Sequence, residues 1–83
     1  MKKIAFIYAD GCKDCDRMRS IIERHVQNSD IIAAESDDPK AVDIAIEYGI
    51  DDLPGCSFGG NVFQGEKFSS EKLNQALLNY FKN

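Results

Sequence analysis

The spacing of apolar residues changes several times along the chain, and each change predicts a new element. Residues 3–8 form a nearly continuous apolar run, which is typical of a strand buried on both faces. Residues 13–28 then carry apolar side chains three to four positions apart, which is the spacing of an amphipathic helix. Residues 30–35 hold a second short apolar run and predict a second strand. The apolar positions of the helix are Cys15, Met18, Ile22 and Val26.

A second helix is expected to begin at Asp37-Asp38-Pro39, because an acidic cap with proline in the first turn favours a helix start. Gly49 is a suitable residue to end this helix. We expect its buried face to be formed by Val42, Ala45 and Ile46.

The last third of the chain predicts a hairpin and a closing helix. Residues 53–58 and 61–64 are expected to pair as antiparallel strands around the turn Gly59-Gly60. Ser69 or Ser70 is expected to cap the last helix. Its inward stripe is expected to consist of Leu73, Leu77, Tyr80 and Phe81.

Together these elements predict an α/β protein with the order β-α-β-α-β-β-α, folded as a single domain over residues 1–83. The first two strands are joined through a helix, so we expect them to be parallel with a right-handed crossover. The last two strands form the antiparallel hairpin. The result is a mixed four-stranded sheet with helices on both faces.

The charge and length of the chain argue against several classes of function. The 83 residues carry a formal net charge of −4, and the ten Lys and Arg are scattered, which argues against a nucleic-acid binder. No stretch approaches the roughly 20 apolar residues of a membrane helix. The apolar run before Asp10 is also shorter than that of a signal peptide. We therefore expect a cytoplasmic, monomeric protein that contacts neither membrane nor nucleic acid.

Two of the three cysteines, Cys12 and Cys15, lie between the first strand and the first helix. A thiolate at a helix N-terminus faces unpaired N–H groups and the positive end of the helix dipole, which favour the charged form. The spacing places Cys15 one turn further on, within bonding reach of Cys12. We expect Cys12 to be the exposed, attacking sulfur and Cys15, on the apolar stripe, to resolve the mixed disulfide.

Nearby charges oppose the helix effect at Cys12. Aspartates at residues 10, 14 and 16 outnumber the cations Lys13 and Arg17, so the local charge is −1 and should raise the thiol pKa. We predict a moderate nucleophile whose pKa is modulated by Lys13, Asp14 and Arg17.

Two segments carry a resemblance to a known family. They are residues 8–15, Tyr-Ala-Asp-Gly-Cys-Lys-Asp-Cys, and residues 48–54, Tyr-Gly-Ile-Asp-Asp-Leu-Pro. Through them the chain resembles thioredoxin-fold proteins, most nearly the small glutaredoxin-like or redox-active-disulfide members. Gly65 is also similar to a family glycine, so the resemblance spans the whole chain.

The resemblance implies that the Leu53–Pro54 peptide bond is cis and packs beside the dithiol. The backbone of Leu53 would then pair with an extended substrate through β-type hydrogen bonds, which makes Leu53 and Pro54 the expected substrate-binding residues. The chain departs from the family at Gly55, where thioredoxins commonly carry Thr.

The sequence therefore predicts a thiol–disulfide oxidoreductase that works in electron transfer, with the Cys12–Cys15 disulfide in place of a cofactor. Its expected partners are protein disulfides and, as electron donor, a thioredoxin-reductase-like protein or glutathione.

Two alternatives stay open. Thiolates suit Cu(I) and Zn(II), so the first is a soft-metal carrier. A structural zinc site would need Cys12, Cys15, Cys56 and His25 to converge. The second is a thioredoxin-fold domain that acts only in binding. We expect no metal site, Cys56 as a small buried hydrophobe and His25 as a surface or partly buried helix residue.

Overall fold

The computed structural model describes residues 3–27 and 30–82. Helices and strands follow one another in the predicted order. The elements are β1 (Ile4–Tyr8), α1 (Lys13–Glu23), β2 (Ile31–Glu35), α2 (Pro39–Tyr48), β3 (Gly55–Phe58), β4 (Asn61–Gln64) and α3 (Ser70–Lys82).

The strands form one mixed sheet in the order β2-β1-β3-β4. β1 pairs with β2 in parallel and with β3 antiparallel, where Phe6 lies opposite Cys56. β3 and β4 form a hairpin around Gly59 and Gly60, whose φ angles of 53° and 83° suit glycine. The predicted fold class, the strand directions and the hairpin are confirmed, although the first hairpin strand begins at Gly55 and not at Leu53.

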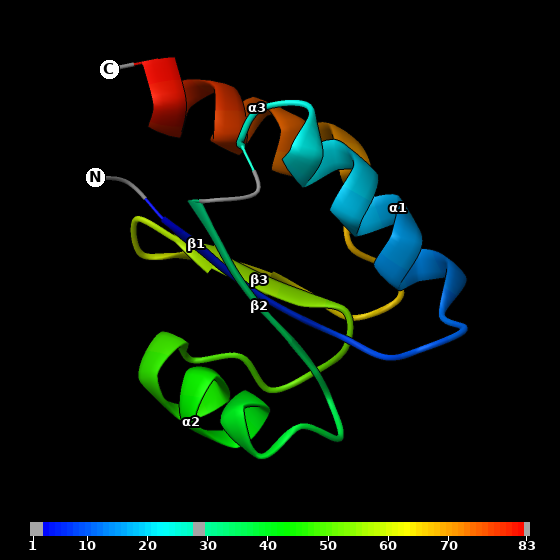
Figure 1. Cartoon of the computed structure of the whole chain (residues 1–83). Helices are drawn as coiled ribbons and strands as arrows, with labels where there is room; N and C mark the ends of the chain where they lie inside the picture. The colour runs from blue at the N-terminus through cyan, green and yellow to red at the C-terminus, as the bar shows by residue number, and fades with distance from the viewer. Residues whose placement is uncertain (1–2, 28–29, 83) are drawn as a thin grey trace.

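Helices cover both faces of the sheet, with α1 and α3 together on one face and α2 on the other (Figure 1). Successive side chains of β1 point to opposite faces, so Phe6 belongs to the core under α1 and α3, and Ile7 to the core under α2. The first core also contains Met18, Ile22, Cys56, Phe58, Leu73 and Leu77. The second contains Ala5, Ala34, Ala41 and Ile50.

The buried face of α2 includes Ala45, as predicted, but not Val42 or Ile46. Val42 is 60% exposed and Ile46 is 77% exposed, so neither packs against the sheet. The helix instead contacts the sheet through Ala41, which is 4% exposed. Because Ala41 has a small side chain, the helix backbone can approach the sheet closely, and the buried stripe starts one position before the predicted one. Ile44, Ala45 and Tyr48 are partly buried beside it.

The ends of the other helices follow from local hydrogen bonds. α1 ends at Glu23, earlier than predicted, and the predicted end at Asn28 lies outside the described residues. The backbone N–H groups of His25 and Val26 both bond to the carbonyl of Ile22 at 3.0 Å, which closes the helix in a turn. Val26 is still buried as predicted, at 7% exposure.

The predicted helix caps are present. The side chain of Asp38 caps α2, and Gly49 ends it with a φ of 73°. The side-chain oxygen of Ser69 accepts a hydrogen bond from the N–H of Lys72 at 3.1 Å, so Ser69 caps α3. Leu73 and Leu77 on this helix are fully buried, and Tyr80 and Phe81 pack partly buried beside them. No helix within the described ranges is long and apolar enough to cross a membrane.

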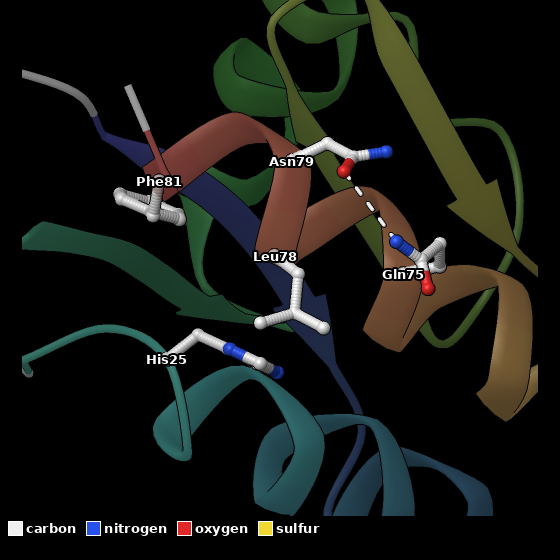
Figure 2. Close-up of a pocket in the computed structure, with 5 residues that line it drawn as sticks. All are labelled: His25, Gln75, Leu78, Asn79 and Phe81. Carbon is white, nitrogen blue, oxygen red and sulfur yellow. Dashed lines mark hydrogen bonds between the residues drawn. The ribbon is translucent and has the colours of Figure 1, made fainter.

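The end of α1 meets α3 at a cavity of about 420 Å³. His25 faces this cavity and is half-buried as predicted, but it lies in the turn after α1 and not in the helix, and its Nε2 lies 2.6 Å from Oδ1 of Asn74. Because His25 follows the C-terminal end of α1, the cavity lies far along the helix from Cys12 and Cys15. It is lined by His25, Gln75, Leu78, Asn79 and Phe81 (Figure 2).

Candidate redox site

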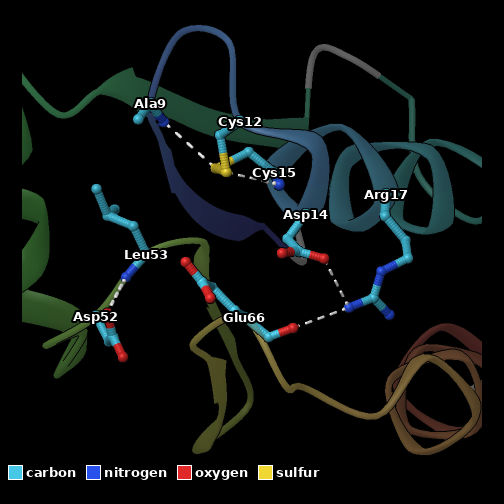
Figure 3. The surroundings of a disulfide bond; sticks show 8 residues. All are labelled: Ala9, Cys12, Asp14, Cys15, Arg17, Asp52, Leu53 and Glu66. Carbon is cyan, nitrogen blue, oxygen red and sulfur yellow. Dashed lines mark hydrogen bonds and ion pairs between the residues drawn. A yellow bond between two sulfur atoms is a disulfide. The ribbon is translucent and has the colours of Figure 1, made fainter.

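Cys12 and Cys15 lie where β1 leads into α1, and a disulfide bond joins them (Figure 3). Their Cα atoms are 5.2 Å apart. Cys12 is the N-cap residue of α1, with extended backbone angles, and Cys15 belongs to the first turn. The chain can turn between strand and helix because Gly11 adopts a φ of 72°, which glycine accepts without strain.

The two sulfur-bearing residues differ in exposure. Cys12 is half-buried, whereas Cys15 is 2% exposed and lies on the same helix face as Met18 and Ile22. A partner can therefore approach Cys12 but not Cys15. If Cys12 attacks a partner and Cys15 resolves the mixed disulfide, this difference in exposure is what the two roles require. The roles themselves stay predictions.

Backbone N–H groups point at both sulfurs. The N–H of Cys15 donates to Sγ of Cys12 at 3.1 Å, and the N–H of Ala9 donates to Sγ of Cys15 at 3.4 Å. Such donors, together with the N-terminal end of the helix dipole, favour negative charge on a sulfur once the disulfide is reduced. The acidic first turn, with Asp14 and Asp16, opposes this effect.

Arg17 connects α1 to the segment between β4 and α3. Its guanidinium donates to Oδ1 of Asp14 and to the backbone carbonyl of Glu66, both at 3.2 Å. It also bonds to the side chain of Ser70 and lies 3.9 Å from the centroid of the Phe68 ring. In Figure 3 the guanidinium reaches Asp14 and Glu66, away from the sulfurs. That Arg17, Asp14 and Lys13 modulate the Cys12 pKa stays a prediction.

The segment around Pro54 lies next to the dithiol. The Leu53–Pro54 peptide bond is cis. Gly55 pairs with Ile7, so Pro54 and Leu53 continue past the end of β1 toward Ala9, whose N–H reaches Cys15. Figure 3 shows Leu53 across from the disulfide.

Three hydrogen bonds hold this segment in place. Oε1 of Gln64 accepts from the N–H of Asp51 at 2.7 Å and from the N–H of Asp52 at 3.2 Å. The N–H of Gly65 donates to the carbonyl of Pro54 at 2.9 Å. The end of β4 therefore fixes the position of the residues that precede β3.

Gly55 has a packing role that explains the departure from thioredoxins at this position. A Cβ at Gly55 would lie 2.2 Å from Cγ2 of Ile50 and 2.7 Å from the carbonyl oxygen of Asp52. The loop formed by residues 50–53 therefore occupies the space that a threonine side chain would need.

The backbone N–H of Leu53 already has a partner. It donates to Oδ1 of Asp52 at 2.8 Å (Figure 3). The other carboxylate oxygen of Asp52 faces Gly65, where an added Cβ would lie 3.2 Å from it. Asp52 thus lies between Leu53 and Gly65 and satisfies the N–H of Leu53.

The third cysteine and the histidine lie apart from the dithiol. Cys56 is fully buried on β3, and this burial raises the pKa of its thiol to about 12. His25 is engaged with Asn74 on α3. Among the residues that the structure describes, no group of three His, Cys, Asp or Glu side chains could hold a metal ion.

Comparison with known proteins gives a fold. No protein-family model matches the chain, and no curated protein matches it in sequence. A solved structure of an uncharacterized thioredoxin-like protein from Clostridium perfringens is similar, with a TM-score of 0.67 and 20% identity over 96% of this chain and 71% of that one. A solved structure of a malarial protein is similar with a TM-score of 0.50 and 16% identity, over 98% and 97% of the two chains. The chain has a thioredoxin-like fold.

Sequence reasoning missed the residues that support the site. From the sequence, Gln64 is expected only as the end of a strand, and Asp52 only within the segment that precedes Pro54. Gln64 bonds to Asp51, which lies 13 positions earlier in the chain. The side chain of Asp52 folds back onto the N–H of the next residue. A single sequence carries no periodicity that would reveal such contacts.

Proposed function

We propose that this protein is a thiol–disulfide oxidoreductase that exchanges protein disulfides through Cys12 and Cys15. The observation that carries the proposal is a disulfide at a helix N-terminus with one half-buried and one fully shielded cysteine, within a thioredoxin-like fold. Neither a binding module nor a metal carrier requires this asymmetry.

The proposed reaction proceeds in two exchange steps. The Cys12 thiolate attacks one sulfur of the substrate disulfide, and the other substrate sulfur leaves as a thiolate. The Cys15 thiolate then attacks Sγ of Cys12, forms the Cys12–Cys15 disulfide and releases the second substrate thiolate. Two electrons pass from the protein dithiol to the substrate, and the released thiolates take up protons according to their own pKa values.

Backbone groups support both steps. The N–H of Cys15 stabilises the Cys12 thiolate before it attacks the substrate disulfide. The N–H of Ala9 does the same for Cys15 while it waits for the mixed disulfide. Leu53 and Pro54 are proposed to align an extended substrate beside Cys12, with the N–H of Leu53 free to bond once the Asp52 carboxylate swings away.

The proposed setting follows from this chemistry. A dithiol that reduces disulfides needs a donor that returns it to the reduced form, and a thioredoxin-reductase-like protein or glutathione would serve in a cytoplasmic compartment. We propose a monomer that acts on protein disulfides without a cofactor and without nucleic-acid or membrane partners.

The test is a redox titration of the purified protein. Samples are equilibrated at set ratios of reduced to oxidised dithiothreitol, quenched with an alkylating reagent and weighed by mass spectrometry. Two thiols should appear and disappear together in the parent protein and in the Cys56→Ala control. Cys12→Ser and Cys15→Ser should abolish the transition.

Trapping distinguishes the two cysteines. Cys15→Ser should accumulate a mixed disulfide with a disulfide-bonded peptide through Cys12, whereas Cys12→Ser should accumulate little, because Cys15 is shielded. The proposal fails if the parent protein shows no reversible two-thiol transition, or if it reduces a small disulfide such as hydroxyethyl disulfide no faster than free dithiothreitol does.

A further inference from the structure

The two most exposed large apolar side chains of the described structure lie one helical turn apart on α2. Ile46 is 77% exposed and Val42 is 60% exposed, ahead of Leu78 at 46% and Val62 at 39%. Single exposed apolar residues are ordinary on protein surfaces. Two at positions i and i+4 present a continuous apolar surface on one side of a helix.

This surface borders a groove that leads to the redox site. Val42 lines a cavity of about 210 Å³ between α2 and the loop formed by residues 50–53. Leu53 lines the same cavity and also lies across from the disulfide (Figure 3). A bound segment in the groove would therefore be continuous with the residue that precedes Pro54. The other apolar lining residues are Ile7, Ala41, Ala45 and Ile50.

The net negative charge of the chain lies in the segment that supplies most residues of the groove. Residues 37–53, here called the acidic segment, contain six Asp or Glu and one Lys, a net charge of −5. The whole chain carries −4, so all other residues together carry +1. Asp51 and Asp52 line the groove itself, and Asp43 and Glu47 adjoin the two exposed apolar residues in sequence. Within the described ranges none of the six carboxylates forms an ion pair, since the pair found there joins Asp14 and Arg17.

We propose that this groove docks a basic and apolar segment of the polypeptide whose disulfide Cys12 attacks. The inference rests on the proposed function and names its substrate class. An aliphatic side chain of the substrate covers Val42 and Leu53, and flanking Lys or Arg side chains lie against Asp51 and Asp52. Carboxylates that form no ion pair attract such a segment and repel an acidic one, so they set both the encounter rate and the choice of substrate.

Docking is measured first without any redox step. The probes are two peptides without cysteine, Ser-Lys-Leu-Lys-Ser-Ala and Ser-Glu-Leu-Glu-Ser-Ala, titrated into the oxidised protein. Amide chemical shifts in two-dimensional NMR spectra report where each one binds. The basic peptide should shift residues of α2 and of the 50–53 loop, with a Kd at least about tenfold below that of the acidic peptide. Raised ionic strength should weaken its binding.

Matched variants locate the surface. Val42→Ser with Ile46→Ser should weaken binding of the basic peptide about tenfold. Leu78→Ser with Val62→Ser, which removes comparable apolar groups from α3 and β4, should leave it unchanged. All four side chains are exposed, so both double variants should fold. Neutralising two carboxylates with Asp43→Asn and Glu47→Gln should also weaken binding of the basic peptide. This variant keeps Val42 and Ile46, so it tests the charge separately from the apolar contact.

Kinetics connect docking to the reaction. A cyclic disulfide peptide that contains the basic sequence should have a lower KM than one that contains the acidic sequence. Hydroxyethyl disulfide should be reduced at the same rate by the parent protein and the variants. If hydroxyethyl disulfide is not reduced at all, the proposed function fails, and the NMR titration still decides the docking. If the two peptides bind equally, or if the shifts lie away from α2 and the 50–53 loop, the docking proposal is wrong.

Discussion

The carboxylate of Asp52 accepts a hydrogen bond from the backbone N–H of Leu53, 2.8 Å away, in the segment that leads into Pro54 (Figure 3). In the proposed reaction, an extended substrate pairs with this N–H. Since the Asp52 side chain is exposed, it can leave this position without disturbing the core. In the proposed reaction, Asp52 would therefore compete with the substrate for one hydrogen bond.

Removal of this competitor should favour extended substrates. Asp52→Ala is expected to raise kcat/KM for a peptide disulfide with uncharged flanks by about two- to fivefold, the equivalent of part of one net hydrogen bond. Asp52→Asn keeps an oxygen at the same position and serves as the matched control, with little change expected. Both variants should reduce hydroxyethyl disulfide at the parent rate. A parallel gain on the small disulfide would show that Asp52 acts on Cys12 and not on the backbone of Leu53.

Arg17 and Asp14 should influence Cys12 in opposite directions. Arg17→Met removes the cation that offsets Asp14, so the remaining carboxylate should raise the Cys12 pKa and slow its alkylation near neutral pH by about two- to threefold. Asp14→Asn should speed alkylation. The double variant should return close to the parent rate, and the pH profile of iodoacetamide reaction provides the measurement.

Arg17→Met should also cost about 1–2 kcal/mol of stability, because it loses the contacts to Phe68, Ser70 and Glu66. Urea unfolding of the oxidised protein measures this. Asp14→Asn should leave the urea midpoint nearly unchanged, since the ion pair is partly exposed. Equal destabilisation by both variants would contradict the assignment of Arg17 to the segment that precedes α3.

Gly55→Ala should destabilise the protein by about 2–3 kcal/mol, because the added methyl group collides with Ile50 and with the backbone of Asp52. Gly49→Ala is the control, since nothing lies within 4 Å of its added Cβ and only its φ of 73° opposes alanine. That variant should cost about 1 kcal/mol. Thermal unfolding of the two variants checks the order, and a smaller loss at Gly55 would mean that the 50–53 loop moves away easily.

Cys56 should make the fold sensitive to alkali. Its folded-state pKa of about 12 lies above the value of 9.0 for an unperturbed thiol. The unfolded chain therefore loses this proton first. The stabilising contribution is fully present below pH 9, and it falls as pH rises from 9 toward 12, by about 1 kcal/mol per pH unit.

Other groups also titrate in this range, so the test is a difference. Urea midpoints of the parent protein and of Cys56→Ala are compared at about pH 7.5, 9 and 10.5. These values lie below, at and above the pKa of an unperturbed thiol. The gap between the two proteins should change in favour of Cys56→Ala as the pH rises. A constant gap would show that the buried thiol does not contribute to the pH dependence.

Much of the fold could be predicted because the relevant signals are local. The continuous apolar run of β1, the caps at Asp38 and Ser69, and the turn at Gly59 and Gly60 each depend on a few adjacent residues. The position of Cys12 and Cys15 at a helix start follows from the same signals. These are the features that the structure confirms.

The face of α2 could not be chosen from the sequence. Positions 41 and 45 and positions 42 and 46 are both apolar pairs one turn apart, and the second pair is the larger. The small side chain of Ala41 lets the helix lie close to the sheet, so Ala41 is buried, while the larger Ile46 faces outward. The shape of the sheet face that packs against α2 decides between the two pairs, and the sequence of the helix carries no information about that shape.

The contact of the Ala9 N–H with Sγ of Cys15 provides an internal reporter. When the disulfide is reduced, Sγ of Cys15 becomes a thiol or thiolate. The amide proton of Ala9 should then change its resonance frequency and its exchange rate with water. A single backbone signal just after β1 would thus record the oxidised and reduced fractions of the protein, without a dye or an added cysteine.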